Sequence, residues 1–153
     1  DGIPMNCTLL EIDLRSNGFG NSGAKSLSSA LLVNKNLKKM NLGGNKIGDL
    51  GAKAFANSLR VNQSVQELYF FGNHMGDEGI RALGDALRVN STLQRIKLSG
   101  NDIGKIGCRE LGRSLMINQG LQFLDLWDNR ISVEEMGLIE AICRFKGIAL
   151  ELQ

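Results

Sequence analysis

Several residue types are scarce in this sequence, and each scarcity argues against a class of protein. The 153 residues include one proline, one histidine and three cysteines. The histidine and the cysteines form no cluster with the spacing of metal ligands, and an odd number of cysteines does not indicate a disulfide framework. We therefore expect no metal site and a fold that packing alone stabilises.

Long apolar runs and an excess of one charge are also missing. No stretch of about 18 apolar residues is present, so we expect no transmembrane helix and no membrane partner. The first residues carry no basic region ahead of an apolar core, so we expect no signal peptide. The 18 Lys and Arg nearly balance the 16 Asp and Glu, which gives no reason to expect nucleic acid as a partner.

What the sequence has in abundance is repetition at a single period. One asparagine recurs at a constant interval, at Asn17, Asn45, Asn73, Asn101 and Asn129. A second recurs at the same interval, at Asn6, Asn34, Asn62, Asn90 and Asn118. No insertion breaks the phase of either series. The interval, about 28 residues, is typical of a solenoid built from stacked supersecondary units.

Each repeat begins with the pattern L-x-x-L-x-L-x-x-N and continues with a helical pattern. The stretch 37–62 is the most typical example, with Met40 in the second leucine position. Apolar and polar residues alternate there, which predicts a short strand with one buried face. The following apolar stripe in the third repeat consists of Ile80, Leu83, Ala86 and Leu87. One strand and one helix per repeat predict a parallel sheet covered by a layer of helices.

Both series of asparagines are predicted to be structural. Each strand-to-helix loop leaves backbone groups without sheet or helix partners, and burying them unpaired is costly. An asparagine offers two donors and an acceptor, so the series from Asn17 to Asn129 is expected to form a ladder of bonds to these loops. The series from Asn34 to Asn118 follows each helix, where asparagine tolerates the left-handed backbone that ends helices.

The helix starts also repeat. Asp49 and Asp77 are expected near the N-terminal caps of their own helices. Glycines recur inside the first turn, at Gly51, Gly79 and Gly107. Glycine weakens an isolated helix, so these positions indicate close packing against the neighbouring repeat.

The two ends are in phase with the repeats but incomplete. Residues 3–9 match the end of a helix, and Ile148, Leu150 and Leu152 alternate like one more strand. Lys146 stands where an asparagine is expected, which leaves the register of that strand open. We interpret residues 1–153 as one domain of about five repeats with partial repeats at both ends, a fragment of a longer array. Uncapped ends would permit self-association.

These motifs resemble the ribonuclease-inhibitor-like class of leucine-rich repeats. Residues 45–52 and 87–93 look most like the C-terminal repeats of animal NOD-like receptors. The resemblance implies a right-handed α/β horseshoe with a concave parallel sheet and convex helices. It also implies a non-enzymatic protein-binding module of the cytoplasm and of innate immunity, which senses a ligand or holds another domain of the same chain inactive. A regulator of an enzyme, either a GTPase activator or an inhibitor, is the alternative. Activators of the Ran GTPase share the repeat, but their acidic tail is absent here.

Aromatic and basic residues recur at motif positions that point out of the concave face. They are Tyr69, Phe71, Arg95, Lys97, Phe123 and Trp127, and they include the only Trp and the only Tyr. Interface hot spots favour such residues, so we predict a partner-binding patch. The alternative is that Phe71 and Trp127 only cover the lip of the core. Acids and bases are mixed on this face, which favours a protein partner over nucleic acid.

No pattern of residues indicates catalysis or a cofactor. The glycines are periodic, so they do not indicate a phosphate-binding loop. His74 lies in a loop position, and the repeat implies no nucleophile or carboxylate beside it. Cys108 and Cys143 fall in core helix positions, where thiols are inert, whereas Cys7 falls in a surface position and is a candidate reactive thiol. We predict that the chain is not an enzyme.

Overall fold

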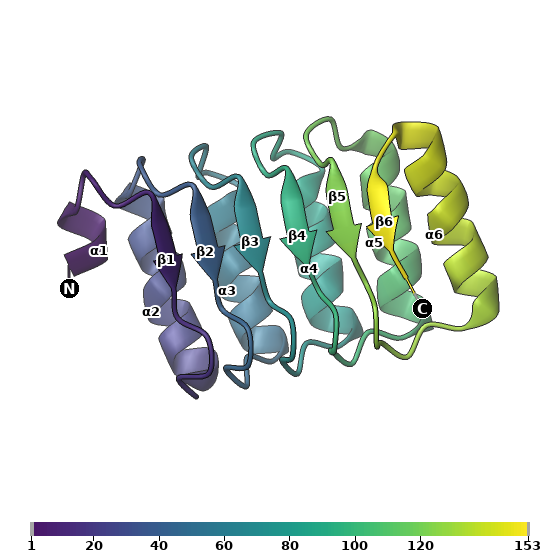
Figure 1. Ribbon diagram of the computed structural model, residues 1–153, viewed down its shortest axis with the longest axis horizontal. Coiled ribbons are helices and arrows are strands. Elements are labelled where there is room, and N and C mark those ends of the chain that lie inside the picture. Colours follow the sequence, from purple (N-terminus) through teal and green to yellow (C-terminus); the bar gives the residue numbers. More distant parts are fainter. Residues whose placement is uncertain (1, 153) are drawn as a thin grey trace.

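The chain forms a right-handed coil in which strands and helices alternate (Figure 1). The computed structural model describes residues 2–152. Within them, the six strands are β1 (Glu11–Asp13), β2 (Lys39–Asn41), β3 (Glu67–Tyr69), β4 (Arg95–Lys97), β5 (Phe123–Asp125) and β6 (Ala149–Glu151). The helices are α1 (Gly2–Met5), α2 (Gly20–Val33), α3 (Asp49–Leu59), α4 (Asp77–Leu87), α5 (Lys105–Ile117) and α6 (Val133–Lys146).

All six strands lie parallel in one sheet, in the order in which they occur in the chain. The helices cover one face of this sheet and leave the other face open (Figure 1). The predicted leucine-rich-repeat solenoid is therefore confirmed. Within residues 2–152, every helix is too short or too polar to span a bilayer.

The register of the sheet repeats the period of the sequence. Glu11 pairs with Lys39, and each later partner lies one full period further along the chain, up to Phe123. The last pair joins Phe123 to Ala149, which shortens the final repeat by two residues. Gly147 explains the shortening, because it ends α6 in the left-handed conformation with φ 69° and turns the chain at once into β6. This settles the register that the sequence left open.

The core lies between the sheet and the helices. The central residue of each inner strand is fully buried, for example Met40, Leu68 and Ile96. The apolar stripes of the helices pack against these residues and form one continuous core. Because each repeat buries its apolar face on its neighbours, the stability of every interior repeat depends on both sides.

The first asparagine ladder is confirmed. Asn45 Nδ2 donates to the carbonyl of Leu14 in the preceding repeat at 2.9 Å and to that of Leu42 in its own repeat at 3.0 Å. Its Oδ1 accepts from the backbone N–H of Asn17 at 2.9 Å. The side chain therefore replaces, from one repeat to the next, the backbone partners that the loops lack.

The second ladder is structural too, but the predicted left-handed backbone is wrong. Asn34 has φ −73° and ψ 124°, and Asn118 has φ −56° and ψ 141°, which are both extended conformations. The side-chain amide makes the stabilising contacts instead. In Asn62, Nδ2 donates to the carbonyl of Leu31 at 2.8 Å and Oδ1 accepts from the N–H of Val65 at 2.9 Å. Asparagine is used here to join a helix end to the neighbouring turn.

The helix caps also cross between repeats, which corrects the sequence prediction for Asp49 and Asp77. Each helix from α3 to α5 starts after a glycine that has no side chain to cap it. Asp49 Oδ1 accepts from Gly76 N at 2.7 Å and Gly79 N at 3.0 Å, so it caps α4 of the next repeat. A Cβ atom at Gly79 would lie 2.7 Å from this oxygen. The predicted close packing at this glycine is confirmed, because the cap needs the space.

Candidate functional site

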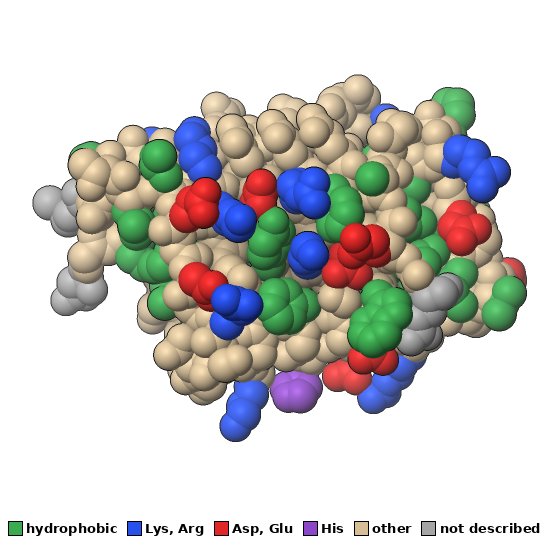
Figure 2. All heavy atoms as spheres, viewed as in Figure 1, with side chains coloured by type: hydrophobic (Ala, Val, Ile, Leu, Met, Phe, Trp, Pro, Cys, Tyr) green, Lys and Arg blue, Asp and Glu red, His purple; other side chains and the backbone are tan. Residues whose placement is uncertain are grey.

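The open face of the sheet presents one outward side chain from every second strand position. We call this surface, formed by β1–β6 and the residues just after each strand, the sheet face. Figure 2 shows it from the front, with apolar, basic and acidic side chains interspersed over the middle strands. The strand pairing places the predicted patch residues side by side, since Tyr69 pairs with Lys97 and Arg95 pairs with Phe123.

Cations and aromatic rings alternate in the centre of the sheet face. Lys97 Nζ lies 5.6 Å from the ring centroid of Tyr69 and 5.6 Å from that of Phe123. The Arg95 guanidinium lies 4.1 Å from the Phe123 centroid, and Lys39 Nζ lies 5.4 Å from the Tyr69 centroid. Contacts of this kind attract a cation to the face of a ring. They hold the basic side chains along the sheet and not out in water.

The aromatic residues differ in how much surface they offer. Phe123 is only 8% exposed, so the prediction that it forms part of an open aromatic surface is wrong. The guanidinium of Arg95 covers its ring. Trp127 is 53% exposed and is the most accessible of the four aromatic residues.

Phe71 has a structural contact on this face. A Cβ atom at Gly43 would lie 2.4 Å from the Phe71 ring, so the ring covers the space that this glycine leaves in the neighbouring repeat. For Phe71 the structure therefore supports the alternative that the ring covers the lip of the core. Trp127 keeps about half of its surface in water, which leaves it available to a partner.

The acids around the centre of the sheet face are already satisfied. Glu67 Oε2 lies 3.6 Å from Lys39 Nζ and accepts a hydrogen bond from the Tyr69 hydroxyl. Asp125 is buried and accepts from Ser99 Oγ at 2.7 Å. Partial burial and then this bond to Glu67 raise the pKa of Tyr69, so its hydroxyl stays a donor at neutral pH.

The two central cations, in contrast, have no carboxylate partner in the part of the chain that the structure describes. Arg95 and Lys97 belong to β4, and both side chains are half-buried. At the N-terminal end of the face, Asp13 and Arg15 pair at 2.8 Å, and the hydrogen bond from Arg15 lowers the pKa of Asp13. The cation at that end is thus ion-paired, whereas, among the described residues, Arg95 and Lys97 are not.

A hollow of about 420 Å³ lies beside this centre, and the sequence reasoning missed it. It is lined by Glu11, Ile12, Asp13, Arg15, Lys39, Asn41 and Tyr69. The surface of the sheet is lower here because Asn41 is small where the next repeat carries Tyr69. A small residue at an outward-pointing strand position would have indicated this hollow in the sequence.

A second hollow, of about 400 Å³, lies where the strands lead into the helices. It is lined by Gly72, Asn73, His74, Gly100, Asn101, Asp102, Asp128, Asn129 and Arg130. The prediction that His74 has no carboxylate beside it is wrong, because its Nδ1 lies 4.0 Å from Asp102 Oδ2. Arg130 holds the same carboxylate at 2.7 Å, and the His74 side chain is 67% exposed. This is a ladder of solvated loop residues and not a catalytic arrangement.

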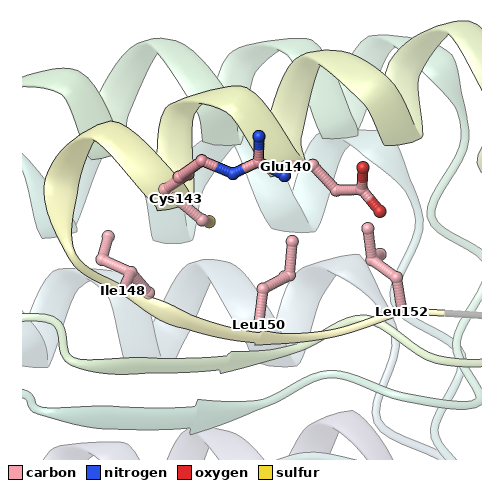
Figure 3. A pocket seen from close by; sticks show the side chains of 6 residues that line it. Glu140, Cys143, Ile148, Leu150 and Leu152 are labelled. Atoms are coloured by element: carbon pink, nitrogen blue, oxygen red, sulfur yellow. The ribbon is translucent and has the colours of Figure 1, made fainter.

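A third hollow lies at the last strand and helix of the described residues. Between α6 and β6 a hollow of about 330 Å³ is lined by Glu140, Cys143, Arg144, Ile148, Leu150 and Leu152 (Figure 3). The side chains of Leu150 and Leu152 point from the last strand toward α6 (Figure 3). This is the end of the core that a further repeat would cover in a longer array.

The cysteines are placed as the sequence predicts. Cys108 and Cys143 are buried, and desolvation raises the pKa of each thiol to about 11. Such thiols stay protonated and inert at neutral pH. Cys7 is exposed. Among the described residues, no group of three or more His, Cys, Asp and Glu side chains is placed to hold a metal ion.

A buried carboxylate joins the last two helices. The side chain of Glu135 is 1% exposed and lies 3.0 Å from Arg109 Nη2 and 3.6 Å from Lys105 Nζ. Ser132, at the N-cap of α6, donates its hydroxyl to the other carboxylate oxygen. This hydrogen bond, followed by the two cations, lowers the pKa of Glu135.

We expect Glu135→Gln to destabilise the protein at neutral pH and to have a smaller effect in acid. Because the folded-state pKa lies below the ordinary value of about 4.3, the carboxylate stabilises the fold above that pH. The contribution is lost as the pH falls through the lowered pKa. Urea unfolding from pH 7 to pH 3 measures the difference between the two proteins. Glu134→Gln is the control, because Glu134 is 72% exposed and contacts the same cations. A difference that does not change with pH would contradict this account.

Comparison with known proteins identifies the repeat. A family model described as "Leucine Rich repeat" matches residues 6–28, 33–56, 61–84 and 89–112. No curated protein sequence matches the chain. A solved structure titled "Leiomodin-1 Actin-Binding Site 2 (ABS2)" has 22% sequence identity and a TM-score of 0.82, and the match covers 94% of this chain and 83% of that one. The tropomodulin C-terminal domain of Caenorhabditis elegans has 16% identity and a TM-score of 0.74, with 92% and 86% covered. At these identities the structural likeness shows the fold alone, but the family model matches more than half of the chain, and the chain belongs to the leucine-rich-repeat family.

Proposed function

We propose that this chain is a non-enzymatic protein-interaction module whose sheet face binds a protein segment that presents carboxylates beside apolar side chains. The observation that carries the proposal is the pair of central cations, Arg95 and Lys97, which form no ion pair with a described carboxylate. They lie on one strand, on the order of 7 Å apart along the chain. Such a pair is complementary to one or two acidic side chains of a partner.

An apolar anchor lies near these cations. Trp127 is half exposed, and it follows β5, the strand that pairs with the strand of Arg95 and Lys97. Tryptophan and arginine dominate the energetics of many interfaces because they combine area with directed polar groups. The ring contacts that hold Arg95 and Lys97 reduce the entropy that binding would otherwise cost.

The resemblance of residues 45–52 and 87–93 to NOD-like receptors favours a cytoplasmic role in which this face senses a ligand or holds another domain of the same chain. Actin is a concrete second partner to test, because one solved structure of the same fold is titled an actin-binding site. The sheet face would serve either partner in the same way, through acids on the partner. Regulation of an enzyme would use the same surface.

The experiment compares three proteins as baits in a cell extract and in sedimentation with purified actin filaments. The patch variant is Lys97→Glu with Trp127→Ala, which changes half-exposed positions and leaves the ring contact of Phe71 intact. The control variant is Lys25→Glu with Leu50→Ala, which makes the same kind of change on exposed helix positions. Wild type and control should bind a common partner, and the patch variant should bind it at least about tenfold more weakly.

Two results would contradict the proposal. One is that the patch variant binds the same proteins, actin included, with the affinity of the wild type. The other is that the control variant loses the same partners, which would place the interface on the helices. Thermal unfolding of all three proteins establishes that each remains folded.

A further inference from the structure

The turns that lead from each helix to the next strand form one edge of the molecule. In Figure 1 they lie in a row along the top, at the opposite end of the strands from the asparagine ladder of Asn17 to Asn129. We call this surface the turn edge and define it by the segments 32–38, 60–66, 88–94, 116–122 and 144–148. These segments contain no Asp or Glu, and their basic residues are Lys35, Lys38, Arg60, Arg88, Arg144 and Lys146.

One apolar side chain per repeat projects from the turn edge. The column consists of Val33, Val61, Val89, Ile117 and Phe145, which occupy the same position in successive repeats. Their exposed fractions are 58%, 57%, 64%, 51% and 78%. Leu32 and Met116, which precede two of them, are also about half exposed. More than half of the surface of each residue in the column is thus exposed to water, so packing of the core does not explain the column.

The basic residues of the turn edge have a structural explanation, unlike the apolar column. Lys35 Nζ donates to the carbonyl of Leu32 at 3.0 Å, and Lys146 Nζ donates to that of Met116 at 3.3 Å. Cations are favoured at the C-terminal ends of helices, where carbonyls are left over. The apolar column has no such explanation. Exposed apolar side chains that recur along one edge, with polar residues beside them, are typical of a surface that contacts a protein or a membrane.

The other edge has the opposite charge. The strand-to-helix loops and the first helical turns carry the acids Asp49, Asp77, Glu78, Asp102, Asp128, Glu134 and Glu135, against the bases Arg15, Lys46, Lys105 and Arg130. The two edges therefore differ in charge. A negatively charged surface would orient the molecule with the turn edge toward it.

We infer that the turn edge docks the chain on an anionic lipid surface. Stacked repeats present their turns in a row, so a flat surface would meet all five apolar residues together. Peripheral membrane binding needs apolar side chains at the headgroup boundary and cations beside them, and it needs no spanning helix. This revises the expectation of no membrane partner, which rested on the absence of a spanning segment. None of the residues that line the hollows described above belongs to the apolar column.

Docking in this way leaves the proposed protein-binding surface accessible. The strands run from the turn edge toward the opposite edge, so the sheet face would stand upright on the bilayer. Arg95 and Lys97 would then remain open to a partner from the side. The inference is independent of the proposed function, because it uses other residues and another surface.

Vesicle flotation tests the inference. The probes are vesicles of phosphatidylcholine and phosphatidylserine, mixed about two to one, and vesicles of phosphatidylcholine alone. We expect the wild type to float with the anionic vesicles, to bind the neutral ones at least about tenfold more weakly, and to be released as salt is raised. Val61→Glu with Val89→Glu should lower the binding to anionic vesicles at least about tenfold.

The matched control is Leu50→Glu with Ile106→Glu. Leu50 and Ile106 are 71% and 63% exposed, and they lie in the first turns of α3 and α5, at the other edge. The change in charge is the same, so equal binding of this variant and the wild type would assign the effect to the turn edge. An equal loss in both variants would overturn the inference, as would a wild type that does not float with anionic vesicles. If the Val61 and Val89 variant instead loses a protein from the extract while vesicles never bind, the edge is a protein interface and the lipid proposal is wrong.

Discussion

Replacing Asn73 with alanine is expected to lower the free energy of unfolding by about 3–5 kcal/mol. This buried side chain makes five hydrogen bonds in the strand-to-helix ladder. Its Oδ1 accepts from the N–H groups of Asn45 at 3.0 Å and Ile47 at 2.9 Å. Its Nδ2 donates to three carbonyls, one of them in the preceding repeat.

The backbone N–H groups that lose their acceptor determine how much the substitution lowers the free energy of unfolding. The carbonyl of Leu42 also accepts from Asn45 Nδ2, and that of Phe70 also accepts from Asn101 Nδ2. These acceptors therefore keep a partner when Asn73 is removed. Among the described residues, the N–H groups of Asn45 and Ile47 have no other acceptor. Each would be buried unpaired at a cost of about 1–3 kcal/mol.

Asn17→Ala is the matched control, because it removes the same residue from the exposed end of the same ladder. Asn17 Nδ2 donates to the carbonyls of Leu14 and Arg15, and Leu14 keeps a second donor in Asn45. We expect a loss below about 1 kcal/mol. Urea unfolding followed by circular dichroism gives both values. Equal losses at Asn73 and Asn17 would show that the ladder does not act through buried N–H groups.

The fold was predictable because one period governs both the sequence and the structure. Every strand from β1 to β5 pairs in the register that the asparagine spacing implies, and the helices fall where the apolar stripes predict them. The period does not indicate whether a polar side chain forms its hydrogen bonds within its own repeat or with a neighbouring repeat. Asp49 is the first residue of its own helix but caps the next one, because its carboxylate accepts from Gly76 N and Gly79 N of the neighbouring repeat. The final turn departs from the period because Gly147 turns the chain two residues early.

The candidate site was predictable as a set of columns but not as a surface. Strand periodicity placed Tyr69, Lys97 and Phe123 on the open face. The periodicity contained no information on how neighbouring outward side chains contact and cover one another. Arg95 lies over Phe123 and removes it from solvent, because a guanidinium is attracted to a ring face within reach. Phe71 turns toward Gly43 because that glycine leaves space.

The second large effect is expected at Phe70, which occupies a position where the other repeats have leucine. Phe70→Ala should lower the free energy of unfolding by about 3–5 kcal/mol, because the side chain is fully buried and the core closes only partly around the cavity. Phe145→Ala is the control. That side chain is 78% exposed, so its removal should change stability by no more than about 0.5 kcal/mol. Urea unfolding measures both.

The reason for an aromatic at this position lies in the neighbouring helix. Phe55, on α3, is also the exception in its column, and its ring meets that of Phe70 at a centroid distance of 5.1 Å and an angle of 77°. Edge-to-face pairs contribute about 0.5–1.5 kcal/mol beyond the area they bury. A double-mutant cycle with Phe55→Ala and Phe70→Ala should therefore show a coupling of that size, with the double variant less destabilised than the sum of the single ones. Additive losses would mean that each ring acts only through its own burial, and that two departures from the repeat pattern are adjacent without being coupled.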